Sequence, residues 1–400
     1  MKKIKVLDLF SGCGGFSCGF DNGDFEVIAA NDIWDIAGET YQKNHKETKF
    51  FLGTITDKKI RNDLVTYCKR TGCDVILGGP PCQAYSMSGA RDVDDSRGHL
   101  FEDYVEVVKK IGPKVFVMEN VKGILTMQLD KKNLPPEKKT KLEKIKILEK
   151  KKSSLMLKRK QSKNTSKIKF TKKDDQILDS LKKKLFNLKK ETSMLRDSVP
   201  DLIIRSFKKI GYNVSYQVLN AADFGTPQKR ERVFFIGIKG NGRDIAFPDP
   251  THMNVKIKGL NGDLFKPNLK PWKTTRQSID DLKNKPENPK LNHVFANHST
   301  EFIKRISKTP IGKSVYGNYS DSWYRNPADE PSRTVKENHG GVMIHYEKDR
   351  TMTPRELARL QSFDDNFIFY GSKSDVLVQI GNAVPPMLAS AIARTVKDLS

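Results

Sequence analysis

The chain has 400 residues, 37% of them hydrophobic, and a formal net charge of +24. This length and composition predict a folded, soluble protein of one to three domains. No apolar run approaches the ~20 residues that a membrane span needs, and the N-terminus lacks a signal-peptide segment, so we expect a cytoplasmic protein without membrane contact. Five cysteines, odd in number and without C-x-x-C spacing, argue against a disulfide framework and a zinc site, so no metal is expected.

The first third of the chain alternates short apolar runs with helix-like stretches. Glycine or proline marks nearly every end of these runs. The runs predicted to be strands are residues 5–10, 26–30, 74–77, 114–118, 214–219 and 232–238. This α/β rhythm predicts one sheet domain built from residues 1–126 and 200–240.

Residues 127–199 interrupt this predicted sheet domain. Their segment 131–196 holds 22 lysines, 2 arginines and 7 acidic residues, a net charge of +17. Two leucine-rich runs follow helical spacing there and predict a protruding helical, coiled-coil-like hairpin. The runs are Leu142, Ile145, Leu148 and Leu155, and then Leu178, Leu181, Leu185, Leu188 and Leu195. Two interpretations stay open, a solvated basic insertion and an arm that contacts phosphates without sequence preference.

The α/β rhythm is lost after residue 240. Proline, asparagine, lysine and scattered aromatic residues become frequent, which predicts a second, smaller domain over residues 241–375. The final segment, 376–400, returns to an apolar helix pattern, and we expect this helix to pack back on the first domain.

The first predicted strand ends in a glycine loop, residues 8–17 (DLFSGCGGFS), that leads into a helix. Such a loop lets the backbone approach a ligand closely. A dinucleotide fingerprint would need a third glycine where Ser17 stands, so a hydride-transferring dehydrogenase fits less well. Asp32, at the end of the second strand, is placed to accept hydrogen bonds from a ribose. An ordinary loop acid is the alternative interpretation of this residue.

The sharpest local signal is the sequence GGPPCQ at residues 78–83. It places Cys82 just past a buried strand and a rigid double proline, at the carboxyl edge of the predicted sheet. A structural cysteine would usually sit within the apolar run itself. A thiol with the ordinary pKa of ~8.5 needs nearby positive charge or a proton acceptor to act as a nucleophile.

Two later strands offer such groups. Glu119 lies at the carboxyl end of one strand and residues 228–232 (QKRER) precede another, and parallel strands would bring both to the edge that holds Cys82. In that arrangement the Cys82 thiol attacks carbon 6 of a cytosine, the protonated carboxyl of Glu119 relieves charge at N3, and an arginine holds O2. Carbon 5 then takes a methyl group from a sulfonium donor over the glycine loop. Taken separately, Glu119 and Arg232 could form an ordinary salt bridge.

At these motifs the chain resembles the cytosine-5 DNA methyltransferase family, and the motifs occur in the family's order. The resemblance covers the chain except residues 127–199 and most of 241–328. The matching segments are the glycine loop and residues 80–83, 119–121, 228–232, 330–335, 352–356 and 381–386. The resemblance implies an α/β fold: a Rossmann-like S-adenosylmethionine-dependent methyltransferase sheet with a second, smaller target-recognition domain and an inserted basic helical hairpin.

The resemblance also implies functional residues by position. The catalytic residues are Cys82, Glu119, Arg230 and Arg232. Contacts to S-adenosyl-L-methionine come from Phe10, Gly12, Cys13, Gly14, Gly15, Asp32, Ile33, Ile55, Pro81, Leu100, Asn382, Ala383 and Val384. Contacts to DNA come from Gln83, Ser86, Arg97, Gln228 and Arg333. Asp32 stands where the family usually has Glu, Ile33 where an aromatic residue often stacks near adenine, and Thr54 where an Asp is common, which suggests weaker donor binding.

The implied function is methylation of carbon 5 of a flipped-out cytosine in double-stranded DNA of specific sequence. A compact chain of this kind resembles prokaryotic, monomeric modification enzymes of restriction-modification systems, whose cognate endonuclease acts on the same site without a stable complex. The alternatives are a transfer-RNA cytosine methylase and a catalytically silent DNA-binding relative. A substantial segment between Arg232 and Glu330 favours duplex DNA, and the intact Cys82, Glu119 and Arg232 argue against the silent relative.

Overall fold

The computed structural model describes residues 2–81, 100–131, 134–164, 168–240, 242, 244–255, 269–316, 323–336 and 343–400. The chain divides into two compact units. One comprises residues 1–122 and 206–400, and the other comprises residues 123–205. Each unit is described by itself below.

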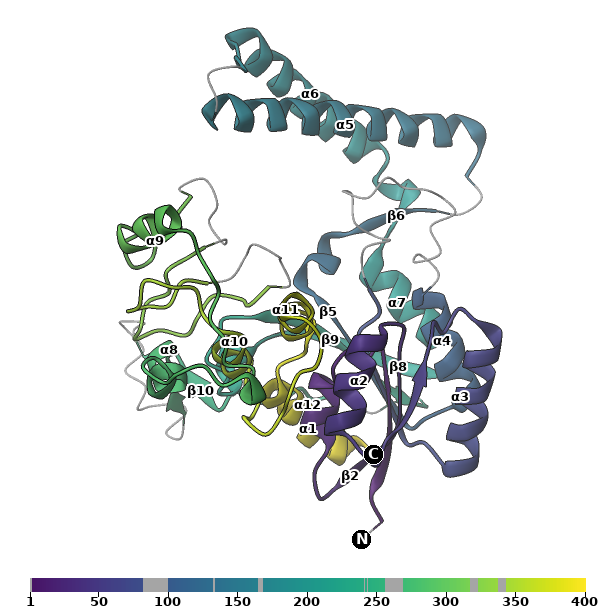
Figure 1. The fold of residues 1–400 in the computed structure, drawn as a ribbon. Coiled ribbons are helices and arrows are strands. Elements are labelled where there is room, and N and C mark those ends of the chain that lie inside the picture. The colour runs from purple at the N-terminus through teal and green to yellow at the C-terminus, as the bar shows by residue number, and fades with distance from the viewer. Residues whose placement is uncertain are drawn as a thin grey trace. The chain divides into compact units, whose positions relative to one another are not determined.

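A seven-stranded sheet forms the centre of the first unit (Figure 1). Its strands are β1 (Ile4–Leu9), β2 (Phe25–Asp32), β3 (Lys49–Leu52), β4 (Val75–Gly78), β5 (Val115–Val121), β8 (Tyr212–Asn220) and β9 (Glu231–Lys239). They are ordered β3-β2-β1-β4-β5-β9-β8, and β9 pairs antiparallel with both neighbours while the other pairs are parallel. This mixed α/β sheet confirms the predicted fold class at that level. Sequence analysis missed β3, a four-residue edge strand.

The inner strands are apolar because helices cover both faces of the sheet. On one face α1 (Gly15–Phe20) packs with α12 (Pro386–Leu399), and Phe16 and Leu388 join one buried cluster with strand residues. The two helices approach closely because Gly19 has no side chain; a Cβ there would lie 2.3 Å from the Cβ of Ala389. These contacts fix the C-terminal helix on the sheet.

The second face of the sheet is covered by α3 (Lys58–Thr71) and α4 (Leu100–Ile111), as Figure 1 shows. Here Phe116 of β5 stacks on Phe207, with ring centroids 3.8 Å apart, and Tyr104 packs edge-on against both. Phe207 belongs to α7 (Val199–Lys208). A separate helix, α2 (Asp35–Asn44), connects β2 to β3. Aromatic burial of this kind anchors the central strands that carry the site.

One described stretch, Lys373–Leu399, is long and apolar enough to span a membrane by length and composition alone. This corrects the expectation that no such run exists. The stretch comprises α11 (Lys373–Asn382) and α12, separated by residues 383–385, and 61% of its most apolar window is buried inside the protein. Its apolar composition is that of core helices.

Most of the described residues between 244 and 375 in this unit are irregular, with short elements. These are β10 (His252–Met253), β11 (Lys270–Pro271), α8 (Thr275–Ile279), α9 (Thr300–Ser307) and α10 (Pro354–Leu360). Capping boxes begin α8, α10 and α11. Phe363 and Ile380 pack in one buried cluster with Cys13 and Ala383, so the glycine loop and the end of α11 share a core.

The second unit holds a short antiparallel strand pair, β6 (Gln128–Asp130) and β7 (Arg196–Ser198), and two helices, α5 (Pro136–Asn164) and α6 (Lys172–Glu191). Leu142 and Ile145 of α5 pack against Leu185 of α6. Ion pairs join Glu149 to Lys189 at 2.7 Å and Lys158 to Asp174 at 3.0 Å, so the helices run antiparallel.

Candidate active site

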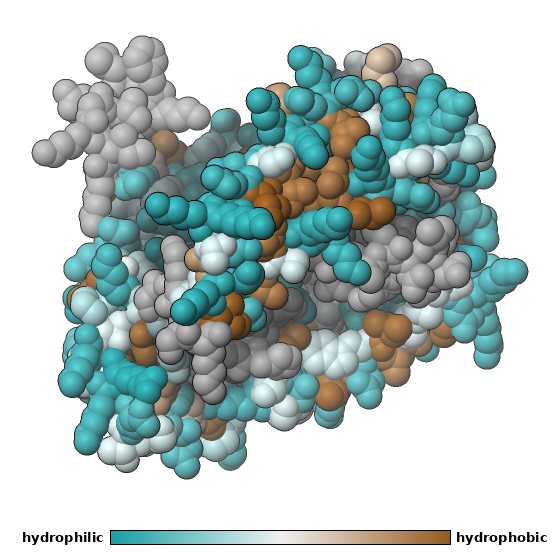
Figure 2. Space-filling view, turned by 90° about the horizontal axis from the view of Figure 1, so that it is seen from above, coloured by the Kyte–Doolittle hydropathy of each residue, from teal (hydrophilic) through white to brown (hydrophobic). Residues whose placement is uncertain are grey.

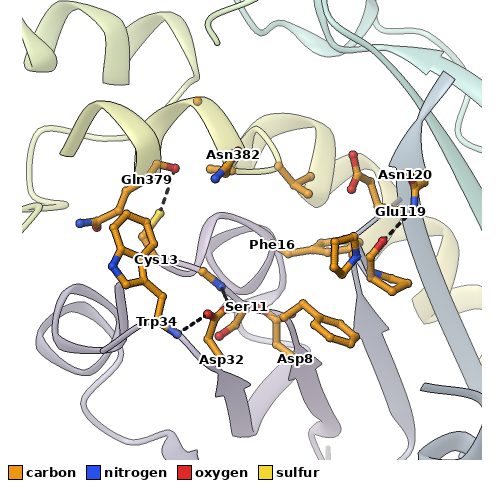
Figure 3. A pocket seen from close by; sticks show the side chains of 18 of the residues that line it. Asp8, Ser11, Cys13, Phe16, Asp32, Trp34, Glu119, Asn120, Gln379 and Asn382 are labelled. Atoms are coloured by element: carbon orange, nitrogen blue, oxygen red, sulfur yellow. Dashed lines mark hydrogen bonds between the residues drawn. The ribbon is translucent and has the colours of Figure 1, made fainter. Parts of the chain in front are cut away.

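A cavity of about 840 Å³ opens at the carboxyl edge of the sheet (Figure 3). Its wall comes from the segments that follow β1, β2, β3 and β4, from the end of β5, the start of β9, and the end of α11. Predicted site residues in this wall are Phe10, Gly12, Cys13, Asp32, Ile33, Ile55, Pro81, Leu100, Glu119, Arg230, Arg232, Asn382, Ala383 and Val384. The carboxyl edge of a mostly parallel sheet is where α/β proteins bind ligands.

The glycine loop turns sharply between β1 and α1. Gly12 and Gly14 have φ values of 53° and 100°, and Phe10 has a φ of 56°, which is rare for a bulky residue. Gly15 lies against the C-terminal segment, because a Cβ there would lie 2.5 Å from the carbonyl oxygen of Val384. The loop is therefore held by the segment after α11, and residues 10–13 line the cavity (Figure 3).

A buried polar network lies beneath the loop. The Ser17 hydroxyl donates to Asp8 at 2.6 Å and contacts the Tyr41 hydroxyl at 2.7 Å. Burial raises the pKa of Asp8 to about 7. Ser17, which stands where a dinucleotide fingerprint has glycine, thus ties α1 to β1.

Asp32 closes the loop from the end of β2. Its two carboxylate oxygens accept hydrogen bonds from the backbone N–H groups of Gly12 at 2.8 Å and Trp34 at 2.9 Å. Burial raises the pKa of Asp32, and the backbone donors oppose that shift. Each oxygen keeps a further lone pair for a ligand hydroxyl.

Trp34 is a cavity residue that sequence analysis missed. Figure 3 shows its indole ring directed into the same part of the cavity as Cys13 and Gln379. Ile33 also lines the cavity and is 69% exposed. An aromatic residue was considered at position 33, and Trp34 is one position later. Its place next to that position is the sequence signal that could have identified it.

Gln379 lines the cavity, and its side chain is buried behind the wall. Its backbone carbonyl accepts from the Cys13 thiol at 3.7 Å, and its side-chain nitrogen donates to the Tyr370 carbonyl at 2.8 Å. Its buried Oε1 has no hydrogen-bond partner within the part of the chain that the structure describes.

Glu119 and Arg232 meet at the far end of the cavity. Arg232 Nε lies 2.9 Å from Glu119 Oε1, and both side chains are largely buried. A Cβ at Gly79 would lie 3.2 Å from Glu119 Oε2, so the second carboxyl oxygen is on the side of the Gly79–Pro81 segment. Burial raises the pKa of Glu119, opposed by the charges of Arg232 and Arg230.

The expectation that parallel strands bring Glu119 and the arginines together was wrong. Residues that precede a parallel strand would lie at the opposite edge from the end of β5. Because β9 is antiparallel to β5, Val121 pairs with Arg232 and the start of β9 lies at the carboxyl edge. The antiparallel strand brings the arginine to Glu119.

Arg230 and Gln228 are interior residues. The Arg230 guanidinium donates to the carbonyls of Val335, Gly381 and Ala383 at 2.9, 2.8 and 3.2 Å, and its side chain lines the cavity. Gln228 is fully buried, and its amide donates to the Leu360 carbonyl and the Gln361 side chain and accepts from Val335 N–H. Both residues brace the start of β9 against the C-terminal segments.

The remaining predicted residues stand apart from these. Cys82, Gln83, Ser86 and Arg97 lie outside the described residues. Pro81, which precedes Cys82, lines the cavity, and the Pro80 carbonyl accepts a hydrogen bond from Asn120 Nδ2 at 2.9 Å. Sequence analysis did not assign Asn120 this anchoring contact. The Arg333 guanidinium lies over the Tyr324 ring, 3.7 Å from its centroid.

Residues 4–148 and 183–398 match the family described as C-5 cytosine-specific DNA methylase. A type II methyltransferase of Haemophilus parahaemolyticus, M1.HphI, is 34% identical over 99% of this chain and 87% of its own length. A type II methyltransferase of Neisseria gonorrhoeae, M.NgoFVII, is 31% identical over 98% of this chain and 86% of its own.

Solved structures share the fold at low identity. The S. pombe Dnmt2 methyltransferase covers the whole of both chains with a TM-score of 0.58 and 15% identity. The Entamoeba histolytica methyltransferase EhMeth has a TM-score of 0.55 and 16% identity, over 100% of this chain and 99% of its own. The seven-stranded mixed sheet with its edge cavity is thus a methyltransferase fold.

The chain belongs to the C-5 cytosine-specific DNA methylase family. It is a DNA (cytosine-5-)-methyltransferase, as the motifs in its sequence predicted.

Proposed function

We propose that the enzyme transfers a methyl group from S-adenosyl-L-methionine to carbon 5 of a cytosine in duplex DNA, with Cys82 as the nucleophile. One observation carries the proposal: a single cavity joins the glycine loop to the Glu119–Arg232 pair and reaches Pro81, the residue before Cys82. A donor site and a base site therefore share one space.

Glu119 serves as the acid in this proposal. Arg232 Nε holds one carboxyl oxygen, which leaves Oε2 on the side of the Gly79–Pro81 segment. Burial favours the protonated carboxyl, which can donate to N3 of cytosine while the Cys82 thiolate attacks carbon 6. Arg232, whose Nε lies 2.9 Å from Glu119 Oε1, holds O2 of the same ring in this proposal. After methylation of carbon 5, loss of the carbon-5 proton to water re-forms the bond between carbons 5 and 6 and releases the Cys82 thiolate.

The cavity wall fits S-adenosyl-L-methionine. Asp32 offers acceptors for ribose hydroxyls, and open space lies where Gly12 would carry a Cβ. When bound, the donor supplies an electrophilic methyl group on its sulfonium sulfur. The predicted contact residues that line this part of the cavity are Phe10, Gly12, Cys13, Ile33, Ile55, Pro81, Leu100 and residues 382–384; Gly14 and Gly15, also predicted, are not among the lining residues.

Trp34 is expected to bind the adenine ring in place of the aromatic residue that is missing at position 33. Trp34→Ala should weaken S-adenosyl-L-methionine binding about 5- to 10-fold, because aromatic contacts contribute roughly 0.5–1.5 kcal/mol beyond buried area. Isothermal titration calorimetry of the protein without DNA measures this directly. Ile33→Ala is the matched control, and a larger loss in that variant than in Trp34→Ala would assign the contact to Ile33.

Arg230 and Gln228 act as positioning residues in this proposal. Their buried hydrogen bonds to Val335, Gly381 and Leu360 hold the start of β9, and therefore Arg232, in place.

We also propose that Gln83, Ser86, Arg97 and Arg333 contact DNA. The flipped base costs a few kcal/mol of unstacking, which such contacts offset.

We propose that the catalytic domain is formed by residues 1–126, 200–240 and 376–400. The target-recognition domain comprises residues 241–375, and an inserted basic helical hairpin comprises residues 127–199. The named relatives are type II methyltransferases, which supports a modification role in a restriction-modification system of a prokaryotic cytoplasm. We propose a monomer that shares its site with a cognate endonuclease without stable contact.

Bisulfite sequencing of DNA from cells that express the protein tests this function. The expected result is protection of one cytosine within one short recurring sequence, since conversion spares 5-methylcytosine. Cells that express a Cys82→Ala variant, in which methyl transfer is expected to be abolished, provide the background. Uniform conversion of all cytosines, with methyl transfer from labelled donor to transfer RNA instead, would favour the transfer-RNA methylase. No transfer to either nucleic acid would favour the silent relative.

A further inference from the structure

A groove of about 710 Å³ runs between α5 and α6 in the second unit. Its floor is aliphatic, formed by Leu148 and Leu155 of α5 and Ile177 and Leu181 of α6. Ile177 is 43% exposed, although it belongs to a helix whose neighbouring seam residue Leu181 is buried. The two-helix pair thus leaves one side of its apolar seam partly open, with Ile177 exposed and Leu148 and Leu155 half-buried.

Lysines line the rim of this groove. Lys151 stands on α5, and Lys173 and Lys184 stand on α6, while no acidic residue among those described lines the groove. Within the described part of the chain these three lysines have no carboxylate partner, whereas Lys158 and Lys189 nearby pair across the two helices. Figure 2, which views the molecule from the side of α5 and α6, shows hydrophobic surface between hydrophilic side chains.

The groove lies almost entirely outside the family match. That match stops at Leu148 and resumes at Lys183, and all but two of the groove-lining residues fall between these points. The chemistry shared by the family therefore does not require the groove. Its partly exposed aliphatic floor needs a different explanation.

The composition of the groove selects one kind of occupant. Phosphate contact needs lysines but gains nothing from an aliphatic floor, so duplex DNA explains only the rim. A second copy of the insertion would bring a net charge of +17 against another of the same sign. A helix with one apolar stripe and flanking carboxylates would pack its stripe on the aliphatic floor and pair its carboxylates with the lysines at the rim.

We propose that the α5/α6 groove docks an acidic amphipathic helix of a partner protein. Lys173, Ile177, Ser180 and Lys184 follow 4-3-4 spacing, which is the spacing of a helix-facing stripe. Residues 173 to 184 span about 16 Å of helix, which matches roughly three turns of a docked helix. The groove and its partner form a three-helix arrangement with lysine–carboxylate pairs at its edges.

A synthetic helix tests the proposal with the full-length protein. The probe is a fluorescent peptide of about three heptads with leucine at heptad positions a and d and glutamate at e and g. Its control has the same composition in scrambled order, so that charge is equal but no apolar stripe forms. Fluorescence anisotropy at physiological salt should show saturable binding of the first peptide and binding at least about tenfold weaker of the second.

Matched variants locate the binding surface. Ile177→Asp should weaken peptide binding at least about tenfold, while Phe186→Asp, at an exposed apolar position outside the groove, should leave it unchanged. The double variant Lys151→Glu/Lys184→Glu should weaken binding similarly. Lys150→Glu/Lys183→Glu, with the same charge change next to the groove, should not.

Methyl transfer to DNA is expected to stay unchanged in all four variants, so loss of catalysis and loss of docking are measured separately. Equal binding of the ordered and scrambled peptides would overturn the proposal, as would equal effects of groove and control variants. If Lys151→Glu/Lys184→Glu lowered duplex DNA affinity while neither peptide bound, the groove would be a phosphate-contacting surface instead.

Discussion

Replacing Glu119 with glutamine is expected to lower kcat for methyl transfer by about 10²- to 10⁴-fold, the range for loss of a general acid. Glutamine keeps the shape of the glutamate side chain, and its amide oxygen can still accept a hydrogen bond from Arg232, whose Nε lies 2.9 Å from Glu119 Oε1. It cannot deliver a proton to N3 of the cytosine. Single-turnover methyl transfer with saturating donor and DNA measures the change in the chemical step.

The pH profile separates this role from a structural one. The acid works in its protonated form, so the wild-type rate should fall as pH rises through the pKa of Glu119, which burial raises above its ordinary value. The Glu119→Gln variant should lose that alkaline fall. Glu231→Gln is the matched control, because Glu231 is exposed and pairs with Lys122. An unchanged alkaline limb in Glu119→Gln would assign it to another group.

The central part of the site could be predicted because it depends on local sequence signals. Buried apolar runs identified β4 and β5, and the carboxyl ends of adjacent parallel strands must lie together, which brings Pro81 and Glu119 to one edge. The antiparallel direction of β9 was also available in principle. Only ten residues separate β8 from β9, too few for the helical crossover that a parallel connection requires.

Other parts of the site could not be read from the sequence. Gln228 looks like a polar loop residue, yet it is fully buried because its partners, Leu360 and Gln361, come from a segment more than 130 residues later. The terminal nitrogens of Arg230 donate to the carbonyls of Val335, Gly381 and Ala383, partners that no local sequence pattern predicts. Long-range pairing of buried polar groups decides such positions, because burial without a partner would be costly.

The same long-range pairing anchors the segments around Glu119. Arg230 ties the start of β9 to the C-terminal segment, and Asn120 ties the Pro80 carbonyl to β5. Glu119 lies between these two anchors and is held by Arg232. A catalytic acid needs such fixed neighbours, since small displacements of reacting groups cost large factors in rate.

Cys82→Ala is expected to abolish methyl transfer, with a loss on the order of 10⁶-fold, the scale found when a covalent nucleophile is removed. Binding of S-adenosyl-L-methionine should persist, because the donor end of the cavity is built by the glycine loop, Asp32 and the segment after α11.

An oligonucleotide with 5-fluorocytosine at the target position provides the direct readout of the Cys82 adduct. With donor present, the wild type should form a denaturation-resistant protein–DNA adduct, because fluorine at carbon 5 cannot leave as a proton does. Cys73→Ala, which removes one of the other thiols, should form the adduct normally. An adduct in Cys82→Ala, or a crosslinked peptide that maps elsewhere in the chain, would place the nucleophile at a different residue.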